Sequence, residues 1–148
     1  MGRIEKSIII KAPPTDVWEL LALDRLPEWT EGLQERVEYT SEVSTPENKY
    51  RVGASTRTNI KGAGTVDFEI TASLKHEKLT YRMLGKRAMN TFVTYLLEPR
   101  EDGTQFKYVM TYKLPWGILG KAFGKLGEGT LEKEAERSLE NLKNILEK

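Results

Sequence analysis

Apolar and polar residues alternate with two different periods along the 148-residue chain, and the change of period separates its elements. Residues 3–11 are predicted to form a strand rich in β-branched side chains, which ends at the two prolines that follow. Helical spacing then runs over residues 15–23, with Thr15 or Asp16 as the N-cap. A second short helix is predicted from residue 24 to Gly32, where the glycine can close it.

Between residues 33 and 115 the period is two, which is typical of strands with one buried face. Six strands separated by short turns are predicted, over residues 33–43, 51–60, 65–75, 78–84, 89–99 and 103–115. Asp67 and Glu69 belong to the solvent face of the strand at 65–75. Its predicted inward residues are Val66, Phe68, Ile70, Ala72 and Leu74.

After Pro115 the helical period returns and continues to Lys148. This is the only long element available to cover the apolar face of an antiparallel sheet. The predicted fold is therefore α+β: a seven-stranded curled antiparallel sheet gripping a long carboxy-terminal helix, with two short helices after the first strand. The sequence has no linker or internal repeat, so residues 1–148 are predicted to form a single domain.

Four segments give the sequence a resemblance to a known family: IIIKAPPTDVWELLALDRLPEWTEGL, VGASTRTNIKGAG, LEPREDGTQFKYVMTYKLPWGILGKAFGKL and ERSLENLKNILE. Together they resemble the polyketide cyclase/dehydrase and lipid-transport branch of the START-like (SRPBCC) superfamily, over residues 3–147. The resemblance implies the helix-grip fold and a large apolar cavity between sheet and helix that holds a hydrophobic small molecule. It implies no catalytic residue, because the family has no catalytic signature common to all its members.

The residues expected to contact such a ligand lie on the inward faces of the strands and at the start of the long helix. A sheet face of aromatic, methionine and threonine side chains combines apolar area with hydroxyls that can orient a ligand. Alternatively these side chains only fill the core, and a register shift of one residue would exchange the two faces. The predicted ligand-binding residues are Thr56, Thr58, Phe68, Ile70, Tyr81, Met83, Val93, Tyr95, Tyr108, Met110, Tyr112, Trp116, Leu119, Gly120, Phe123, Gly124 and Gly127.

The stretch WGILGKAFGKLGEG, residues 116–129, places five glycines at the start of the long helix. On a helical wheel the glycines at 117, 120, 124 and 127 continue the stripe of the leucines that follow. A continuous helix would leave room for a ligand there and expose the apolar residues of 118–126. A break or kink near 127–129 would instead turn those residues inward as a lid. The kink is favoured, because glycine pairs are common kink sites, and because a helix of about 30 residues is about 45 Å long whereas such a domain is only about 40 Å across.

Composition limits the possible functions. The formal net charge is +1, so the basic excess typical of nucleic-acid binding is missing. With no cysteine and one histidine, a disulfide, thiolate chemistry or a histidine-rich metal site is excluded, and no cofactor is expected. No apolar run reaches the roughly 18 residues that cross a bilayer, and the amino terminus lacks the apolar region of a signal peptide. A cytoplasmic location is expected.

Three functions stay open at this point. The first is binding or transport of a hydrophobic small molecule such as a lipid, an isoprenoid or a polyketide-like compound. The second is catalysis like that of a polyketide aromatase/cyclase, which needs a polar residue with a shifted pKa deep in the cavity. The third is a protein-interaction module or homodimer formed through the apolar face at residues 118–126.

Overall fold

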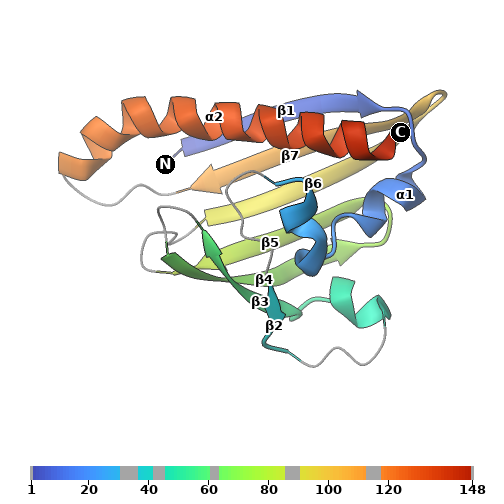
Figure 1. Cartoon of the computed structure of the whole chain (residues 1–148), viewed down its shortest axis with the longest axis horizontal. Helices are drawn as coiled ribbons and strands as arrows, with labels where there is room; N and C mark the ends of the chain where they lie inside the picture. Colours follow the sequence, from blue (N-terminus) through green and yellow to red (C-terminus); the bar gives the residue numbers. More distant parts are fainter. Residues whose placement is uncertain are drawn as a thin grey trace.

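An antiparallel sheet of seven strands forms the frame of the molecule in the part of the chain that the structure describes (Figure 1). This computed structural model describes residues 2–30, 37–41, 46–60, 64–85, 91–112 and 118–147, with side chains except at positions 46, 47, 60, 64 and 118–131. The strands follow the order β1-β7-β6-β5-β4-β3-β2. Their bounds are β1 Gly2–Ile10, β2 Glu38–Tyr39, β3 Ser55–Ile60, β4 Gly64–Leu74, β5 Lys78–Leu84, β6 Thr91–Arg100 and β7 Gly103–Tyr112.

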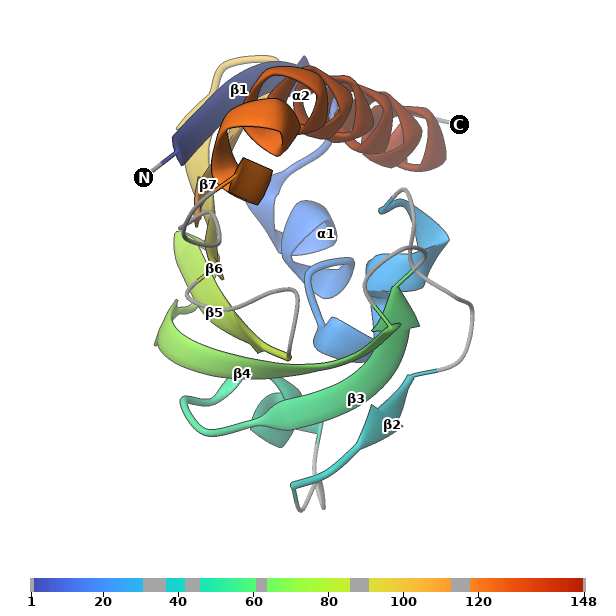
Figure 2. The ribbon, with the colours of Figure 1, turned by 90° about the vertical axis from the view of Figure 1, so that its left-hand side faces the viewer.

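The sheet curls, and helices fill its concave side (Figure 2). They are α1 (Pro14–Glu19), the 3₁₀ helix η1 (Leu23–Glu28) and the long α2 (Ile118–Leu146), while a second 3₁₀ helix, η2 (Pro46–Tyr50), lies in the connection from β2 to β3. This is the predicted α+β helix-grip arrangement, which is confirmed. None of the described helices is long and apolar enough to cross a membrane.

Several predicted element boundaries are wrong. Of the strand expected at residues 33–43, the described positions 37–41 contain a strand of two residues, and positions 33–36, 42 and 43 lie outside the described residues. Residues 51–54 form a turn and not a strand, because Gly53 adopts a φ of +97°, which an extended strand does not allow. The first helix begins at Pro14 and its N-cap is Pro13, not Thr15 or Asp16. Proline suits the first helical position because its φ is already helical and no N–H is needed there.

A β-bulge in β4 corrects the predicted inward face of that strand. The pairing of β4 with β5 shifts between Ile70 and Ala72, so that Ser73 lies opposite buried Leu79. An extra residue in one strand reverses the side-chain alternation beyond it. Leu74 is consequently 55% exposed, although strict alternation predicts it inside.

The long helix α2 is one element from Ile118 to Leu146, so it does not break at residues 127–129, and a kink there stays a prediction. Two contacts place the helix alongside β1: Lys6 Nζ lies 3.0 Å from Glu136 Oε1, and the Lys11 backbone N–H donates to Glu147 Oε2 at 3.1 Å. From Lys6 back to Gly2 the strand spans about 13 Å, which is about nine helical residues. The earlier turns of α2 therefore extend past the start of β1, as Figure 1 shows, so the helix is not limited by the width of the sheet.

Candidate functional site

The concave face of the sheet is built from cross-strand rows of alternate residues. One row runs across β4, β5, β6 and β7 through Ile70, Tyr81, Val93 and Met110. A second row contains Leu79, Tyr95 and Tyr108, and ends at Lys6 on β1. A third contains Thr56, Phe68, Met83 and Thr91. Each row follows from the alternation of side chains along neighbouring strands.

The structure brings the predicted strand residues together on this one face. Met83 is half-buried, and the others are buried: Thr56, Thr58, Phe68, Ile70, Tyr81, Val93, Tyr95, Tyr108, Met110 and Tyr112. Trp116 lies outside the described residues. Gly120, Gly124 and Gly127 lie within α2, as do Leu119 and Phe123, whose side chains are outside the described part. Ligand contact by any of these residues stays a prediction.

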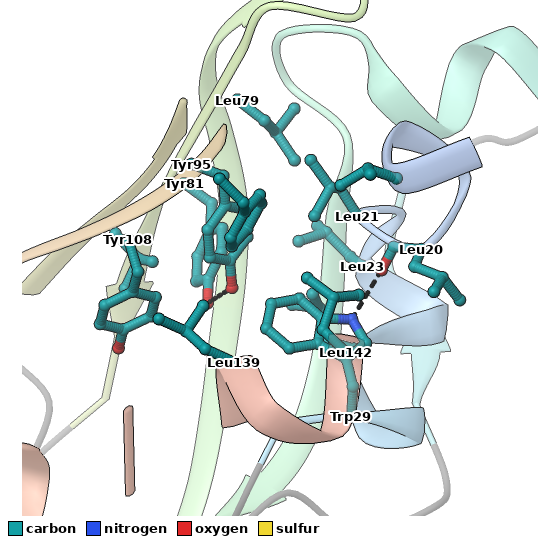
Figure 3. Close-up of a cluster of buried hydrophobic side chains, with 14 of the residues drawn as sticks. Leu20, Leu21, Leu23, Trp29, Leu79, Tyr81, Tyr95, Tyr108, Leu139 and Leu142 are labelled. Carbon is teal, nitrogen blue, oxygen red and sulfur yellow. Dashed lines mark hydrogen bonds between the residues drawn. The ribbon is translucent and has the colours of Figure 1, made fainter. Parts of the chain in front are cut away.

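Two tyrosine hydroxyls form a hydrogen bond in the middle of this face (Figure 3). The Oη atoms of Tyr81 and Tyr95 are 2.9 Å apart, and either one can be the donor. Leu139 of α2 lies beside the pair in Figure 3. Phe68 stacks on the Tyr81 ring at 5.0 Å between centroids, and Trp29 packs against the Tyr95 ring at 5.4 Å. The pair is therefore a polar spot enclosed by aromatic and aliphatic surface.

Two more hydroxyls on the concave face have unused hydrogen-bonding capacity. The Tyr108 ring lies 5.9 Å from that of Tyr95, and among the described residues its hydroxyl makes no hydrogen bond. Thr56 Oγ1 is fully buried without a hydrogen-bond partner in the described structure, as is Thr30 Oγ1 near Trp29. Thr58 differs from Thr56 because it has an interaction partner. Buried polar groups usually have a hydrogen-bond partner, so a buried hydroxyl without one is a candidate contact for a ligand.

Burial controls the ionisation of the three tyrosines. It is the largest cause that raises the pKa of Tyr81, Tyr95 and Tyr108, because a phenolate loses its hydration in the interior. The phenol of Tyr81 and the carboxylate of Glu134 on α2 raise the pKa of Tyr108 further. All three side chains are neutral hydroxyl groups at physiological pH.

The carboxylates of β4 point to the other side of the sheet, as predicted. Asp67 pairs with Arg57 at 2.8 Å, and Glu69 pairs with Arg82 at 2.6 Å. The hydrogen bond from Arg57 is the main cause that lowers the pKa of Asp67. Among the described residues no group of three potential metal ligands occurs.

Sequence reasoning missed how α2 and η1 close the other side of this face. Leu139 and Leu142 of α2 are buried, and Asn141 donates a hydrogen bond to the Trp29 carbonyl at 3.1 Å. The Trp29 indole in turn donates to the Leu20 carbonyl at 2.8 Å. The leucine stripe indicated the buried side of the helix, but no local pattern indicates a contact between residues 112 positions apart.

A protein-family model described as polyketide cyclase/dehydrase and lipid transport matches residues 1–147. The chain belongs to this family. The resemblance drawn from the sequence is thereby confirmed. No curated protein matches the chain in sequence.

Solved structures with the fold of this family are similar over nearly the whole chain. A protein from Bacillus halodurans has a TM-score of 0.74 at 19% identity, covering 99% of this chain and 97% of its own. The Aha1 dimer from Colwellia psychrerythraea has a TM-score of 0.68 at 21% identity, with coverages of 99% and 96%. DynU16, described as a putative protein in the dynemicin biosynthetic locus, has a TM-score of 0.68 at 18% identity, with coverages of 99% and 48%. These similarities show a common fold.

Within this family fold, the cyclase hypothesis requires a buried acid or base. The buried polar side chains among the described residues are hydroxyls: Thr56, Thr58, Thr91, Thr104, Ser138 and the tyrosines. A general acid or base works best with a pKa near the working pH. Burial moves the pKa of the three central tyrosines upward, away from that range. The described part of the site therefore presents neutral hydroxyl groups.

Proposed function

We propose that this protein binds or carries a hydrophobic small molecule, such as a lipid, an isoprenoid or a polyketide-like compound, between the concave face of the sheet and α2. The observation that supports this best is the set of hydroxyls with unused hydrogen-bonding capacity on the concave, otherwise apolar face. Thr56 Oγ1 has no partner in the described structure, and the Tyr108 hydroxyl makes no hydrogen bond there. Binding sites for small molecules combine apolar walls with a few such groups.

The proposal predicts that protein purified from its own host carries a bound compound. Native mass spectrometry should show a mass above that of the bare chain, and denaturation should release the compound. The emptied protein should bind the neutral dye Nile red saturably, and the released compound should displace it. A bare-chain mass together with no displaceable Nile red binding would overturn the proposal.

Two neighbouring residues on β5 provide a matched pair of variants. Met83 is half-buried and packs against the core, whereas Leu84 is 43% exposed on the opposite side. Met83→Trp adds volume on the concave face and should weaken Nile red binding about tenfold or more, which corresponds to about 1.4 kcal/mol. Leu84→Trp adds the same group outside and should leave the affinity unchanged. Equal affinities of the two variants would place the dye elsewhere.

The unbroken α2 supports a second candidate function, a homodimer formed through the apolar residues of 118–126. A continuous helix extends these residues past the start of β1, beyond the sheet that covers its later turns (Figure 1). One similar structure, from Colwellia psychrerythraea, is described as a dimer. In a pair of chains, the apolar residues of 118–126 would pack against each other. This candidate is compatible with ligand binding and is tested separately below.

A further inference from the structure

The hydrogen bond between Tyr81 and Tyr95 leaves one proton unused. Each phenol carries one O–H, and the bond between the two oxygens at 2.9 Å uses only one of them. Neither phenol makes another hydrogen bond among the residues that the structure describes. Tyr81 is 2% and Tyr95 0% exposed, so the second proton does not reach bulk water. A buried donor without an acceptor costs about 1–3 kcal/mol.

The neighbouring hydroxyls add to this excess of donors. Tyr108 lies next to Tyr95 in the same cross-strand row, and its hydroxyl has no described hydrogen bond. Thr56 Oγ1 is an independent case on β3, buried and unpartnered in the described structure. In Figure 3 the hydroxyl oxygens of Tyr81 and Tyr95 lie next to Leu139 of α2. The hydrogen-bonded pair is thus on the side of the sheet that faces α2.

Among the described residues, the charges near this face are unsuited to an ionised ligand. Lys6 ends the row of Tyr108, but it forms an ion pair with Glu136 at 3.0 Å. Glu134, the other acidic residue near Tyr108, has the sign that repels an anion. Moving a carboxylate out of water without a compensating charge costs several kcal/mol.

We propose that the Tyr81–Tyr95 pair is the polar anchor of the ligand site and selects neutral ligands that carry a carbonyl oxygen over hydrocarbons and over ionised acids. The inference rests on the proposed function and specifies its ligand class. One tyrosine donates to the other, and the second donates its proton to the ligand oxygen. A hydroxyl that accepts a hydrogen bond is polarised and becomes a better donor. The tyrosine in contact with the ligand binds it, and the other is a positioning residue.

Three naphthalenes of similar shape test this selection. Acetylnaphthalene carries the carbonyl, isopropenylnaphthalene replaces its oxygen with a CH₂ group, and naphthoate is ionised at neutral pH. Their affinities are measured by competition with Nile red. The ketone should bind about fivefold more tightly than the alkene, as one net hydrogen bond allows. Naphthoate should bind at least about tenfold more weakly than the ketone.

The double variant Tyr81→Phe/Tyr95→Phe removes both hydroxyls and leaves no unpaired partner, so it is expected to fold. Its ketone-to-alkene affinity ratio should fall to about one, while the alkene still binds. In addition, the carbonyl stretching band of bound, isotope-labelled acetylnaphthalene should lie at a lower wavenumber in the wild type than in the double variant. Tyr50→Phe is the matched control: it removes a tyrosine hydroxyl that donates to the Glu19 carbonyl outside the three rows and should keep the ratio. Tyr108→Phe tests whether the hydroxyl of Tyr108 is the donor instead.

The outcomes separate the two proposals. If the naphthalenes and Nile red all fail to bind the wild type, both proposals are overturned. If they bind but the wild-type ratio is about one, only the carbonyl selection is overturned. The role of the Tyr81–Tyr95 pair would also be overturned if the ketone-to-alkene affinity ratio fell to about one in Tyr108→Phe and stayed at about five in the double variant. The donor would then be Tyr108.

Discussion

At Tyr81, Tyr95 and Tyr108, the position in the fold determines the protonation state of the side chain. The three rings lie on adjacent strands, and burial is the main cause that raises the pKa of each hydroxyl. A neutral phenol is a donor over the whole physiological range, whereas a phenolate only accepts. The residues that would hold a ligand carbonyl are thus kept in the form that can do so.

These raised pKa values predict a loss of stability at high pH. An unfolded tyrosine loses its proton near pH 10, and the folded one keeps it. Above about pH 10 the unfolded state therefore binds fewer protons, so the free energy of unfolding falls as pH rises. Each buried tyrosine should contribute about 1.4 kcal/mol per pH unit to this slope. Urea unfolding at a series of alkaline pH values measures it.

Phenylalanine variants test how many tyrosines cause the fall in the free energy of unfolding with pH. Tyr108→Phe should reduce it by the contribution of one proton, and Tyr81→Phe/Tyr95→Phe by that of two. A slope that is the same in all three proteins would mean that these phenols ionise as easily in the folded state as in the unfolded one. It would also remove the argument that they are neutral donors.

Strand parity could predict which residues face inward but not which of them meet. Tyr81 lies opposite Val93, and Tyr95 lies opposite Leu79, so the two tyrosines are diagonal neighbours. A diagonal contact depends on the register between two strands, which no single strand encodes. Parity also failed at Leu74, where one inserted residue in β4 reverses the alternation. The inward set was therefore predictable, and the hydrogen-bonded pair was not.

At the scale of elements, α2 has two segments that differ in what stabilises them. Its later turns are fixed by buried Ala135, Leu139 and Leu142 and by the Lys6–Glu136 and Lys11–Glu147 contacts with β1. Its earlier turns carry the glycines, which lower helix stability by about 1 kcal/mol each relative to alanine. The sequence pattern predicted a helix here, but the expected limit on its length assumed that the helix stays within the width of the domain. The structure shows one uninterrupted helix whose earlier turns extend past the start of β1.

The continuity of α2 predicts that Gly129→Ala stabilises the protein. Position 129 is about 140° around the helix from buried Leu142, so an added methyl group should point away from the sheet. Alanine should raise the free energy of unfolding by up to about 1 kcal/mol, measured by urea denaturation. Gly129→Pro is the opposite test, with a loss of about 3 kcal/mol expected from a break in the helix. A destabilising Gly129→Ala would contradict a continuous helix at this position.

At the scale of the whole molecule, the fold and the ligand have different sources in the sequence. Structures at 18–21% identity keep the same arrangement with TM-scores of 0.68 to 0.74. The fold therefore depends on the pattern of apolar positions, which many sequences can supply. A ligand depends on a few polar groups on the inner face, which can change without altering that pattern. This is why the family could be predicted from the sequence and the bound compound could not.

The apolar residues of 118–126 also lead us to predict that whole chains associate. If residues 118–126 form a dimer contact, light scattering after size exclusion should give twice the mass of one chain at about 0.1 mM protein. Phe123→Glu places a charge in that contact and should weaken association about tenfold or more, since burying an unpaired charge is costly. Lys121→Glu changes charge on the polar side of the same helix and should leave the dimer intact. Circular dichroism checks that α2 persists in both variants. A wild-type protein with the mass of one chain, or a Phe123→Glu dimer as stable as the wild type, would contradict a contact at this face.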